Sequence, residues 1–154
     1  MAGRGRLPTP FRVWIASPEL ARALAPLGEF LASRVSLSKA EAEIAVLLAA
    51  QHVGADYVLA THAREAIAAG LAEEAVDALI AGRLPEFADP RQRAMCAMAL
   101  ALLDRGTPSQ EVFDAAVAAL GHDGVAEGIA LAGYFTAVGL AMKLFAVPPP
   151  AAAR

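Results

Sequence analysis

The chain has 154 residues, of which 57% are hydrophobic and 19% charged, and its formal net charge is −3. This length suits a single domain with a sizeable core, and the scattered basic residues argue against nucleic acid as a partner. The one cysteine, Cys96, excludes an internal disulfide, a CxxC redox pair and a zinc knuckle.

Start and stop signals for helices recur along the chain. Ser17, Pro18 and Glu19 supply an N-cap residue, a proline for the first helical position and an acid for the first turn. Ser38 and Glu41 have the spacing of a capping box and precede an apolar run. Glycines, common at helix C-termini, follow several expected helices: Gly54, Gly70, Gly82 and Gly106. The predicted helices cover about residues 18–33, 38–54, 55–69, 72–81, 90–103, 107–120 and 123–146.

The last two predicted helices differ in character. Thr107 and Gln110 offer a cap and a capping-box glutamine for the first of them. The final helix carries glycines at 128, 133 and 139, each of which costs up to about 1 kcal/mol relative to alanine in a helix. Close packing of another helix should offset this cost, so we expect the final helix to be deeply buried, within the subunit or at a subunit contact.

No segment shows the sustained alternation of apolar and polar residues, bounded by hairpin turns, that is typical of strands. The sequence therefore predicts an all-α fold of six or seven helices. We expect one domain over residues 11–147, with flexible arms at residues 1–10 and 148–154.

The mean hydropathy of +0.48 is high for a soluble protein of this size. Either the chain enters a membrane, or it buries one face against copies of itself. The longest uncharged stretch, residues 128–142, has 15 residues, whereas a membrane-spanning helix needs roughly 20. No apolar segment of a signal peptide follows the first arginines. We therefore expect a cytoplasmic homo-oligomer without a membrane partner.

The three histidines, at positions 52, 62 and 122, form no i, i+4 pair, so no metal site is predicted. His62 lies in the segment GADYVLATHAREA, residues 54–66. On a helix it shares a face with apolar residues at positions 55, 58 and 59. Two interpretations are open: a core histidine with a satisfied hydrogen bond, or the centre of an active site.

Glu43 on the preceding predicted helix favours the second interpretation. It comes 11 residues before Gly54, and His62 comes 8 residues after it, so an antiparallel helix pair would bring the two together. A buried carboxylate needs a partner, or its pKa must rise. A Glu–His pair is a suitable acid–base unit near neutral pH. The alternative is that Glu43 is a surface carboxylate.

Residues 37–71 resemble the core of the carboxymuconolactone decarboxylase-like family, whose superfamily also holds the alkylhydroperoxidase D proteins. Members have a glutamate-bearing helix, a short turn, and a second helix reading C-x-x-C-x-x-x-H or, in decarboxylase-like members, E-Y-x-W-x-x-H. Glu43 and His62 match the glutamate and histidine, and Asp56 and Tyr57 match the acid–tyrosine pair. The resemblance extends over about residues 10–150 and implies an alkylhydroperoxidase D-like helical bundle.

The peroxidase branch of this superfamily needs two cysteines, seven and four residues before the histidine. One thiolate attacks the peroxide and the second thiol resolves the sulfenic acid. Ala55 and Val58 occupy these positions, and Cys96 lies in another predicted helix with no partner. Thiol peroxidase activity is therefore excluded on chemical grounds, and we expect Cys96 to be a core residue.

The decarboxylase branch implies loss of carbon dioxide from a small lactone or unsaturated carboxylic acid, with no metal or organic cofactor. His62 would supply the proton that quenches the released electron density, and Glu43 would set its tautomer and pKa. The resemblance and the sequence together suggest three further pocket residues: Tyr57, His52 and Tyr134. Arginines that could bind a substrate carboxylate are Arg12, Arg64 and Arg91.

We expect the decarboxylase-like protein to assemble as a trimer or hexamer. Two other functions remain open. The chain could instead be a non-catalytic helical oligomer that binds an apolar small molecule and keeps Glu43 and His62 as a structural pair. It could also be a proton-transfer isomerase that uses the same pair.

Overall fold

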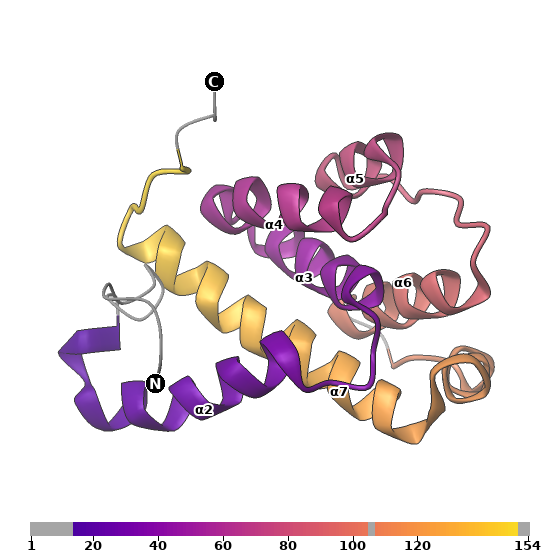
Figure 1. Cartoon of the computed structure of the whole chain (residues 1–154), viewed down its shortest axis with the longest axis horizontal. Coiled ribbons are helices and arrows are strands. Elements are labelled where there is room, and N and C mark those ends of the chain that lie inside the picture. Colours follow the sequence, from indigo (N-terminus) through magenta and orange to yellow (C-terminus); the bar gives the residue numbers. More distant parts are fainter. Residues whose placement is uncertain (1–13, 105–106, 151–154) are drawn as a thin grey trace.

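The computed structural model describes residues 14–104 and 107–150. Within these residues the chain forms six α-helices, one short 3-10 helix and no strand, so the all-α prediction is confirmed. In chain order the elements are η1 (Trp14–Ala16), α2 (Pro18–Ser33), α3 (Lys39–Val53), α4 (Asp56–Ala68), α5 (Glu73–Ile80), α6 (Pro90–Leu103) and α7 (Gln110–Leu144), as Figure 1 shows. The arm predicted at residues 1–10 and the end of the predicted tail, residues 151–154, lie outside the described residues.

The helix boundaries follow the predicted signals closely. Ser38 and Glu41 form the expected capping box at the start of α3. The start of α7 differs from the prediction, because Ser109 rather than Thr107 is its N-cap. The Ser109 Oγ accepts a hydrogen bond from the backbone N–H of Val112, three residues later in the chain. A side-chain oxygen at position 107 is too far back along the chain to accept this bond.

The two last predicted helices are continuous except at one residue. Gly121 interrupts α7 with φ 76° and ψ 169°, a left-handed conformation that favours glycine. The break lies between the predicted end near residue 120 and the predicted start near residue 123. It divides α7 into a shorter first part and a longer second part.

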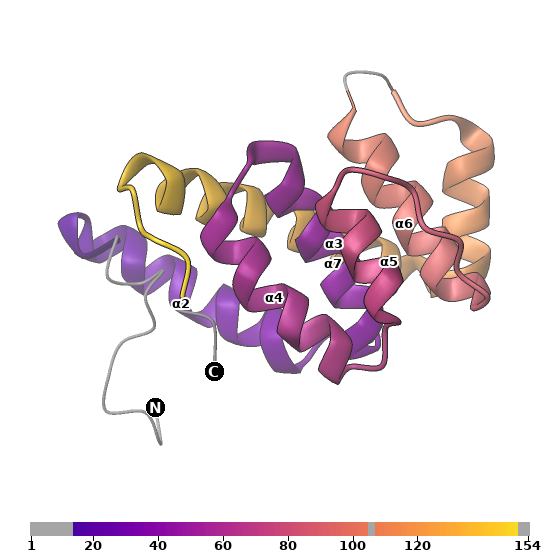
Figure 2. The same cartoon turned by 90° about the horizontal axis from the view of Figure 1, so that it is seen from above.

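Helix α3 is the centre of the molecule. It is buried on every side from Ala40 to Ala50 and packs against α4, α5, α6 and α7. Figures 1 and 2 show α4 and α5 covering one side of α3 while α7 passes along the other side. Because no side of α3 faces water along this stretch, its residues can contact several neighbouring helices at once.

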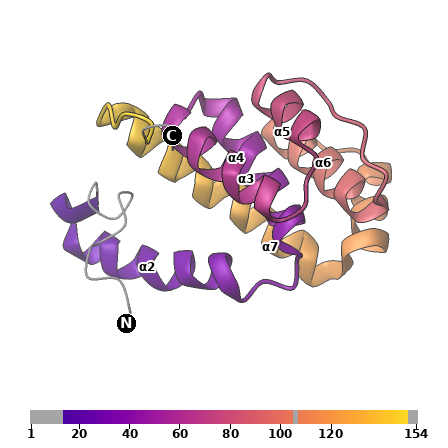
Figure 3. The same ribbon diagram turned by 45° about the horizontal axis from the view of Figure 1, so that its top comes forward.

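Helix α2 is held more loosely. Leu31, near its C-terminal end, is the only fully buried residue that it contributes. In Figure 3, α2 extends along one side of the bundle, with its N-terminal end directed away from α4, α5 and α6. Its C-terminal end and the loop that follows therefore form the part of α2 that closes against the core.

The glycines of α7 do not all serve close packing. A Cβ added at Gly128 would lie 2.5 Å from the Cε of Met98, and one at Gly139 would lie 2.9 Å from the Cβ of Ala55. A Cβ at Gly133 would meet nothing within 4 Å. The expected burial thus holds for Gly128 and Gly139, whereas Gly133 lies on the exposed side of the helix.

Among the described helices, α7 is the one whose length and composition would allow it to cross a membrane. This is weak support for a membrane location, because the buried core helix of a soluble protein passes the same test.

Candidate active site

A cavity of about 240 Å³ lies where the end of α2, the following loop, α3, α4 and α7 meet. Most of its wall is apolar. The end of α2, the loop, α3 and α7 contribute its apolar side chains: Leu31, Ala32, Val35, Leu37, Ala42, Val46, Leu131 and Phe135. The charged or ionisable side chains in the wall are Lys39, Glu43 and His62.

Glu43 is the buried centre of this group, with a side chain only 2% exposed. Its Oε2 lies 2.8 Å from Nδ1 of His62, and its Oε1 lies 2.6 Å from Nζ of Lys39. Burial by itself would raise the pKa of Glu43, but the hydrogen bonds and charges of His62 and Lys39 together outweigh burial and hold this pKa below its ordinary value. The carboxyl group is therefore ionised at neutral pH.

His62 reaches Glu43 because Gly54 turns the chain between α3 and α4. Gly54 adopts φ 65°, and the chain returns so that α4 packs along α3. The imidazole also makes an edge-to-face contact with Phe135 of α7, with ring centroids 4.9 Å apart. Since Nδ1 faces Glu43, Nε2 is the ring nitrogen that can exchange a proton with a molecule in the cavity.

Lys39 is a site residue that the sequence reasoning missed. It occupies the first position of α3, one turn before Glu43, and its side chain is 49% exposed. Its Nζ also lies 3.8 Å from Oε2 of Glu65 on α4. The i, i+4 spacing of Lys39 and Glu43 was the available signal, since side chains at that spacing meet on a helix surface.

The other predicted pocket residues lie elsewhere. Tyr57 lines a separate cavity of about 250 Å³ beside Gly54, and the exposed His52 lines an open cavity between α3 and α6. Tyr134 makes an edge contact with Phe135 but does not line the cavity that contains His62. His52 and Tyr57 lie beside the turn at Gly54, whereas Glu43 lies about three helical turns from it and His62 about two, which explains their separation.

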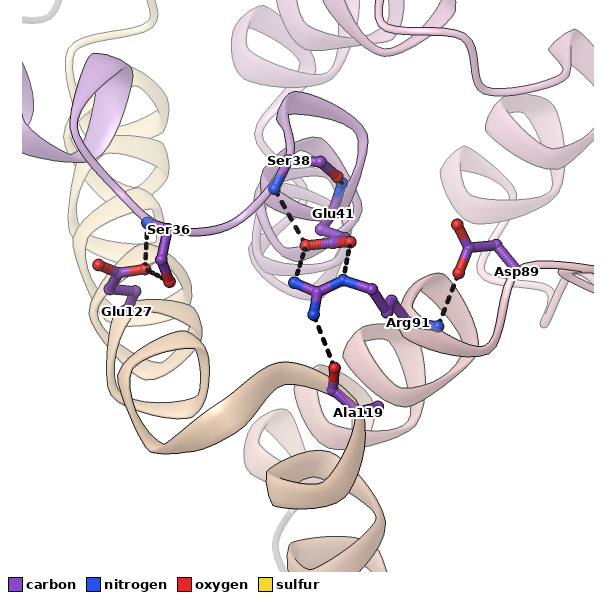
Figure 4. Close-up of polar contacts among 7 residues, drawn as sticks. All are labelled: Ser36, Ser38, Glu41, Asp89, Arg91, Ala119 and Glu127. Atoms are coloured by element: carbon purple, nitrogen blue, oxygen red, sulfur yellow. Dashed lines mark hydrogen bonds and ion pairs between the residues drawn. The ribbon is translucent and has the colours of Figure 1, made fainter.

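The two predicted arginines that the structure describes, Arg64 and Arg91, do not line the cavity either. In Figure 4 the guanidinium of Arg91 donates to both carboxylate oxygens of Glu41, at 2.7 and 3.0 Å, and to the carbonyl of Ala119 at 2.7 Å. Arg91 thus joins the starts of α3 and α6 to α7 as a structural contact. Arg64 is exposed and donates to a backbone carbonyl of its own helix. Arg12 lies outside the described residues.

The positions of the peroxidase cysteines are occupied by buried apolar residues, Ala55 and Val58. Cys96 is buried in α6, as expected, and burial raises the pKa of its thiol to about 11. Within residues 14–104 and 107–150, no three His, Cys, Asp or Glu side chains are grouped so that they could share a metal ion. With Lys39, Glu43 and His62 in its wall, the cavity offers proton transfer by an imidazole beside a carboxylate and an ammonium.

Comparisons with known proteins identify the family and the fold of the chain. The family model of the carboxymuconolactone decarboxylase family matches residues 18–103, more than half of the chain. A crystal structure from Agrobacterium tumefaciens, described as a protein of unknown function and a candidate antioxidant defence protein AhpD, superposes with a TM-score of 0.76. The two chains are 19% identical, and the match covers 89% of this chain and 94% of the other, which shows a shared AhpD-like fold. No curated protein sequence matches the chain.

Proposed function

Because this chain belongs to the carboxymuconolactone decarboxylase family, we propose that it decarboxylates a small lactone or unsaturated carboxylic acid. The reaction uses His62 and Glu43 as an acid–base pair and requires no metal or organic cofactor. The observation that carries the proposal is the 2.8 Å contact between Glu43 and His62 in the wall of an apolar cavity.

His62, Glu43 and the apolar wall have different roles in the reaction. When the bond to the substrate's carboxylate breaks, carbon dioxide leaves and the electron pair of that bond moves into the unsaturated system. His62, in its protonated form, delivers a proton from Nε2 to the carbon that receives this density, and it regains a proton from solvent afterwards. The Glu43 carboxylate keeps Nδ1 protonated and stabilises the imidazolium before the transfer. The apolar wall limits water around the reacting group, which strengthens these electrostatic interactions.

We do not extend the antioxidant description of the Agrobacterium protein to this chain. A thiol peroxidase needs a reactive thiolate and a resolving thiol. Ala55 and Val58 cannot supply them, and the raised pKa of Cys96 keeps its thiol protonated.

The test is turnover of carboxymuconolactone, followed by ultraviolet absorbance, with the purified protein and its His62→Gln variant. Wild type should consume the lactone, and His62→Gln should lose at least about 100-fold in kcat, since general acid–base catalysis typically contributes that much. His122→Gln is the matched control, because His122 is exposed at the break in α7 and outside the cavity.

Equal rates for wild type and His62→Gln would reject the role of His62. No turnover by the wild type would reject carboxymuconolactone as the substrate. Binding of the lactone without turnover would favour the non-catalytic alternative, in which Glu43 and His62 only stabilise the fold.

We also propose that the chain forms a homo-oligomer. Apolar side chains are exposed along one side of the second part of α7, among them Ile129, Leu140 and Leu144. Monomeric soluble proteins rarely expose large contiguous apolar patches, and such a patch is typical of a subunit contact.

A further inference from the structure

Lys39 has a role that the acid–base pair does not account for. Its ammonium group can donate three hydrogen bonds. One is used on Oε1 of Glu43 at 2.6 Å, and Oε2 of Glu65 lies at 3.8 Å, beyond hydrogen-bond distance. The ammonium therefore retains donor capacity at the wall of the cavity, where half of its side chain is still exposed.

The charges in the cavity wall favour a bound anion. Lys39 and Glu43 are its lysine and its acid, and their charges cancel. When His62 is protonated for proton delivery, the wall carries one net positive charge.

The Lys39 ammonium could pair with either the departing or the retained carboxylate of the substrate, and the two pairings have different effects on the reaction. An ammonium paired with the departing carboxylate would stabilise a charge that is lost as carbon dioxide forms, so it would stabilise the ground state more than the transition state. An ammonium paired with a retained carboxylate stabilises both states equally and positions the substrate. Lys39 and His62 contact the two oxygens of the same Glu43 carboxylate, so an anion on Lys39 would lie beside the imidazole.

We propose that Lys39 Nζ binds a carboxylate that the substrate retains through the reaction, and so positions the substrate against His62. This inference rests on the proposed function and assigns Lys39 as the residue that positions its substrate. A cavity of about 240 Å³ suits a compact molecule, on the order of ten non-hydrogen atoms, smaller than those that occupy typical ligand pockets.

The test is binding of benzoate and benzamide, which have the same shape but differ in charge, measured by isothermal titration calorimetry. Wild type should bind benzoate at least about 10-fold more tightly than benzamide, as a charge-assisted hydrogen bond would give. Lys39→Gln should lose this preference, and Lys39→Arg should keep most of it. Arg83→Gln removes the same charge at an exposed site outside the cavity and should bind like wild type.

Two results would overturn the proposal. One is that wild type binds benzoate no more tightly than benzamide, including the case in which neither binds. The other is that Lys39→Gln, shown to be folded by circular dichroism, keeps the preference for benzoate.

This binding test is independent of turnover, so its failure is distinguishable from that of the proposed function. If benzoate binding depends on Lys39 but carboxymuconolactone is not consumed, the assigned reaction fails and the anion site stands. If turnover depends on His62, Lys39→Gln should raise KM at least about 10-fold with a smaller change in kcat, the pattern of a uniform binding contact. Unchanged KM in that variant would reject the role of Lys39 and leave the proposed reaction intact.

Discussion

Glu43 is a charged residue in the interior, where a carboxylate without partners would be strongly unfavourable. Each of its oxygens has a partner, Lys39 on one side and His62 on the other. Lys39 lies at the start of the same helix, α3, and His62 lies on α4. The contact between Glu43 and His62 therefore also joins α3 to α4. The same contacts that make Glu43 a suitable partner for a catalytic imidazole therefore contribute to folding.

The lowered pKa of Glu43 makes stability depend on pH. In the unfolded chain this carboxyl takes up a proton near its ordinary pKa of 4.5, whereas in the folded protein it stays ionised to lower pH. Its contribution is therefore present above about pH 4.5 and is lost as the pH falls through the folded pKa. Glu41, whose pKa the side chain of Arg91 lowers against the effect of burial, has the same sign.

We expect Glu43→Gln to lower the free energy of unfolding at pH 7 by about 2 kcal/mol, because a neutral amide leaves its buried partners poorly satisfied. The variant should also lose less stability than the wild type between pH 5 and pH 3, because it lacks the carboxyl group whose protonation contributes to that loss. Urea unfolding at several pH values measures both effects. Parallel stability profiles for wild type and variant would contradict the assignment of this pH dependence to Glu43.

Cys96 allows a simple check of its environment. Its thiol is buried and has a pKa of about 11, so almost no thiolate exists at neutral pH. We expect a thiol reagent such as DTNB to leave the native protein unmodified at pH 7.5 and to react fully in 6 M guanidinium. Rapid stoichiometric reaction of the native protein would show that α6 opens or that Cys96 is accessible.

Four helices end in the same way. The N–H groups of Ala55, Leu71, Arg83 and Val147 each donate to a carbonyl five residues earlier, which is the hydrogen bond of a Schellman motif. The left-handed residue of this motif is glycine in α3, α4 and α5, but it is Ala146 at the end of α7, with φ 48°. Alanine pays a steric penalty there that glycine avoids.

Replacing Ala146 should therefore stabilise the protein, whereas the reverse change at an equivalent site should destabilise it. We expect Ala146→Gly to raise the free energy of unfolding by about 0.5–1 kcal/mol and Gly70→Ala to lower it by about 1 kcal/mol. Gly70 has φ 97°, and an added Cβ there would meet no atom within 4 Å, so only backbone conformation changes. Urea denaturation of each single variant measures the change in the free energy of unfolding. A loss of stability in Ala146→Gly would refute the proposed steric penalty at Ala146.

These helix ends are the part of the fold that local sequence predicts well, because caps and left-handed glycines act over a few residues. Counting residues on either side of Gly54 also brought Glu43 and His62 together, and the predicted family is confirmed. Lys39 was missed although its spacing from Glu43 was visible, because α3 is buried on every side and its sequence does not indicate which neighbour each position faces.

His52 was predicted as a pocket residue, but the structure places it outside the cavity that contains His62. Nine residues of helix separate it from Glu43, a rise of about 13 Å, which places it near the other end of α3. Tyr57 is displaced from His62 in the same direction. Which side chains of α3 and α4 reach the cavity depends on how these helices pack, and helix periodicity alone does not predict that packing.

The molecule as a whole leaves apolar surface uncovered on the second part of α7. Ile129, Gly133, Ala137, Leu140 and Leu144 follow one another at spacings of three or four residues and are all exposed; we refer to them as the α7 stripe. Gly133 costs up to about 1 kcal/mol in a helix, and an added Cβ there would meet no atom of this subunit within 4 Å. Close approach of a second subunit would offset that cost and cover the stripe.

We expect the wild-type protein to form an oligomer, and the double variant Ile129→Lys, Leu140→Lys to have a lower mass. Both side chains are about half exposed, so lysine at these positions should leave the subunit folded but make burial of the stripe unfavourable. Light scattering after size-exclusion chromatography, at one protein concentration, gives the mass relative to the 15.9 kDa subunit. Leu84→Lys is the control, since Leu84 is 70% exposed and lies outside the stripe. A wild-type mass equal to one subunit, or an unchanged mass in the double variant, would show that the α7 stripe does not form the contact.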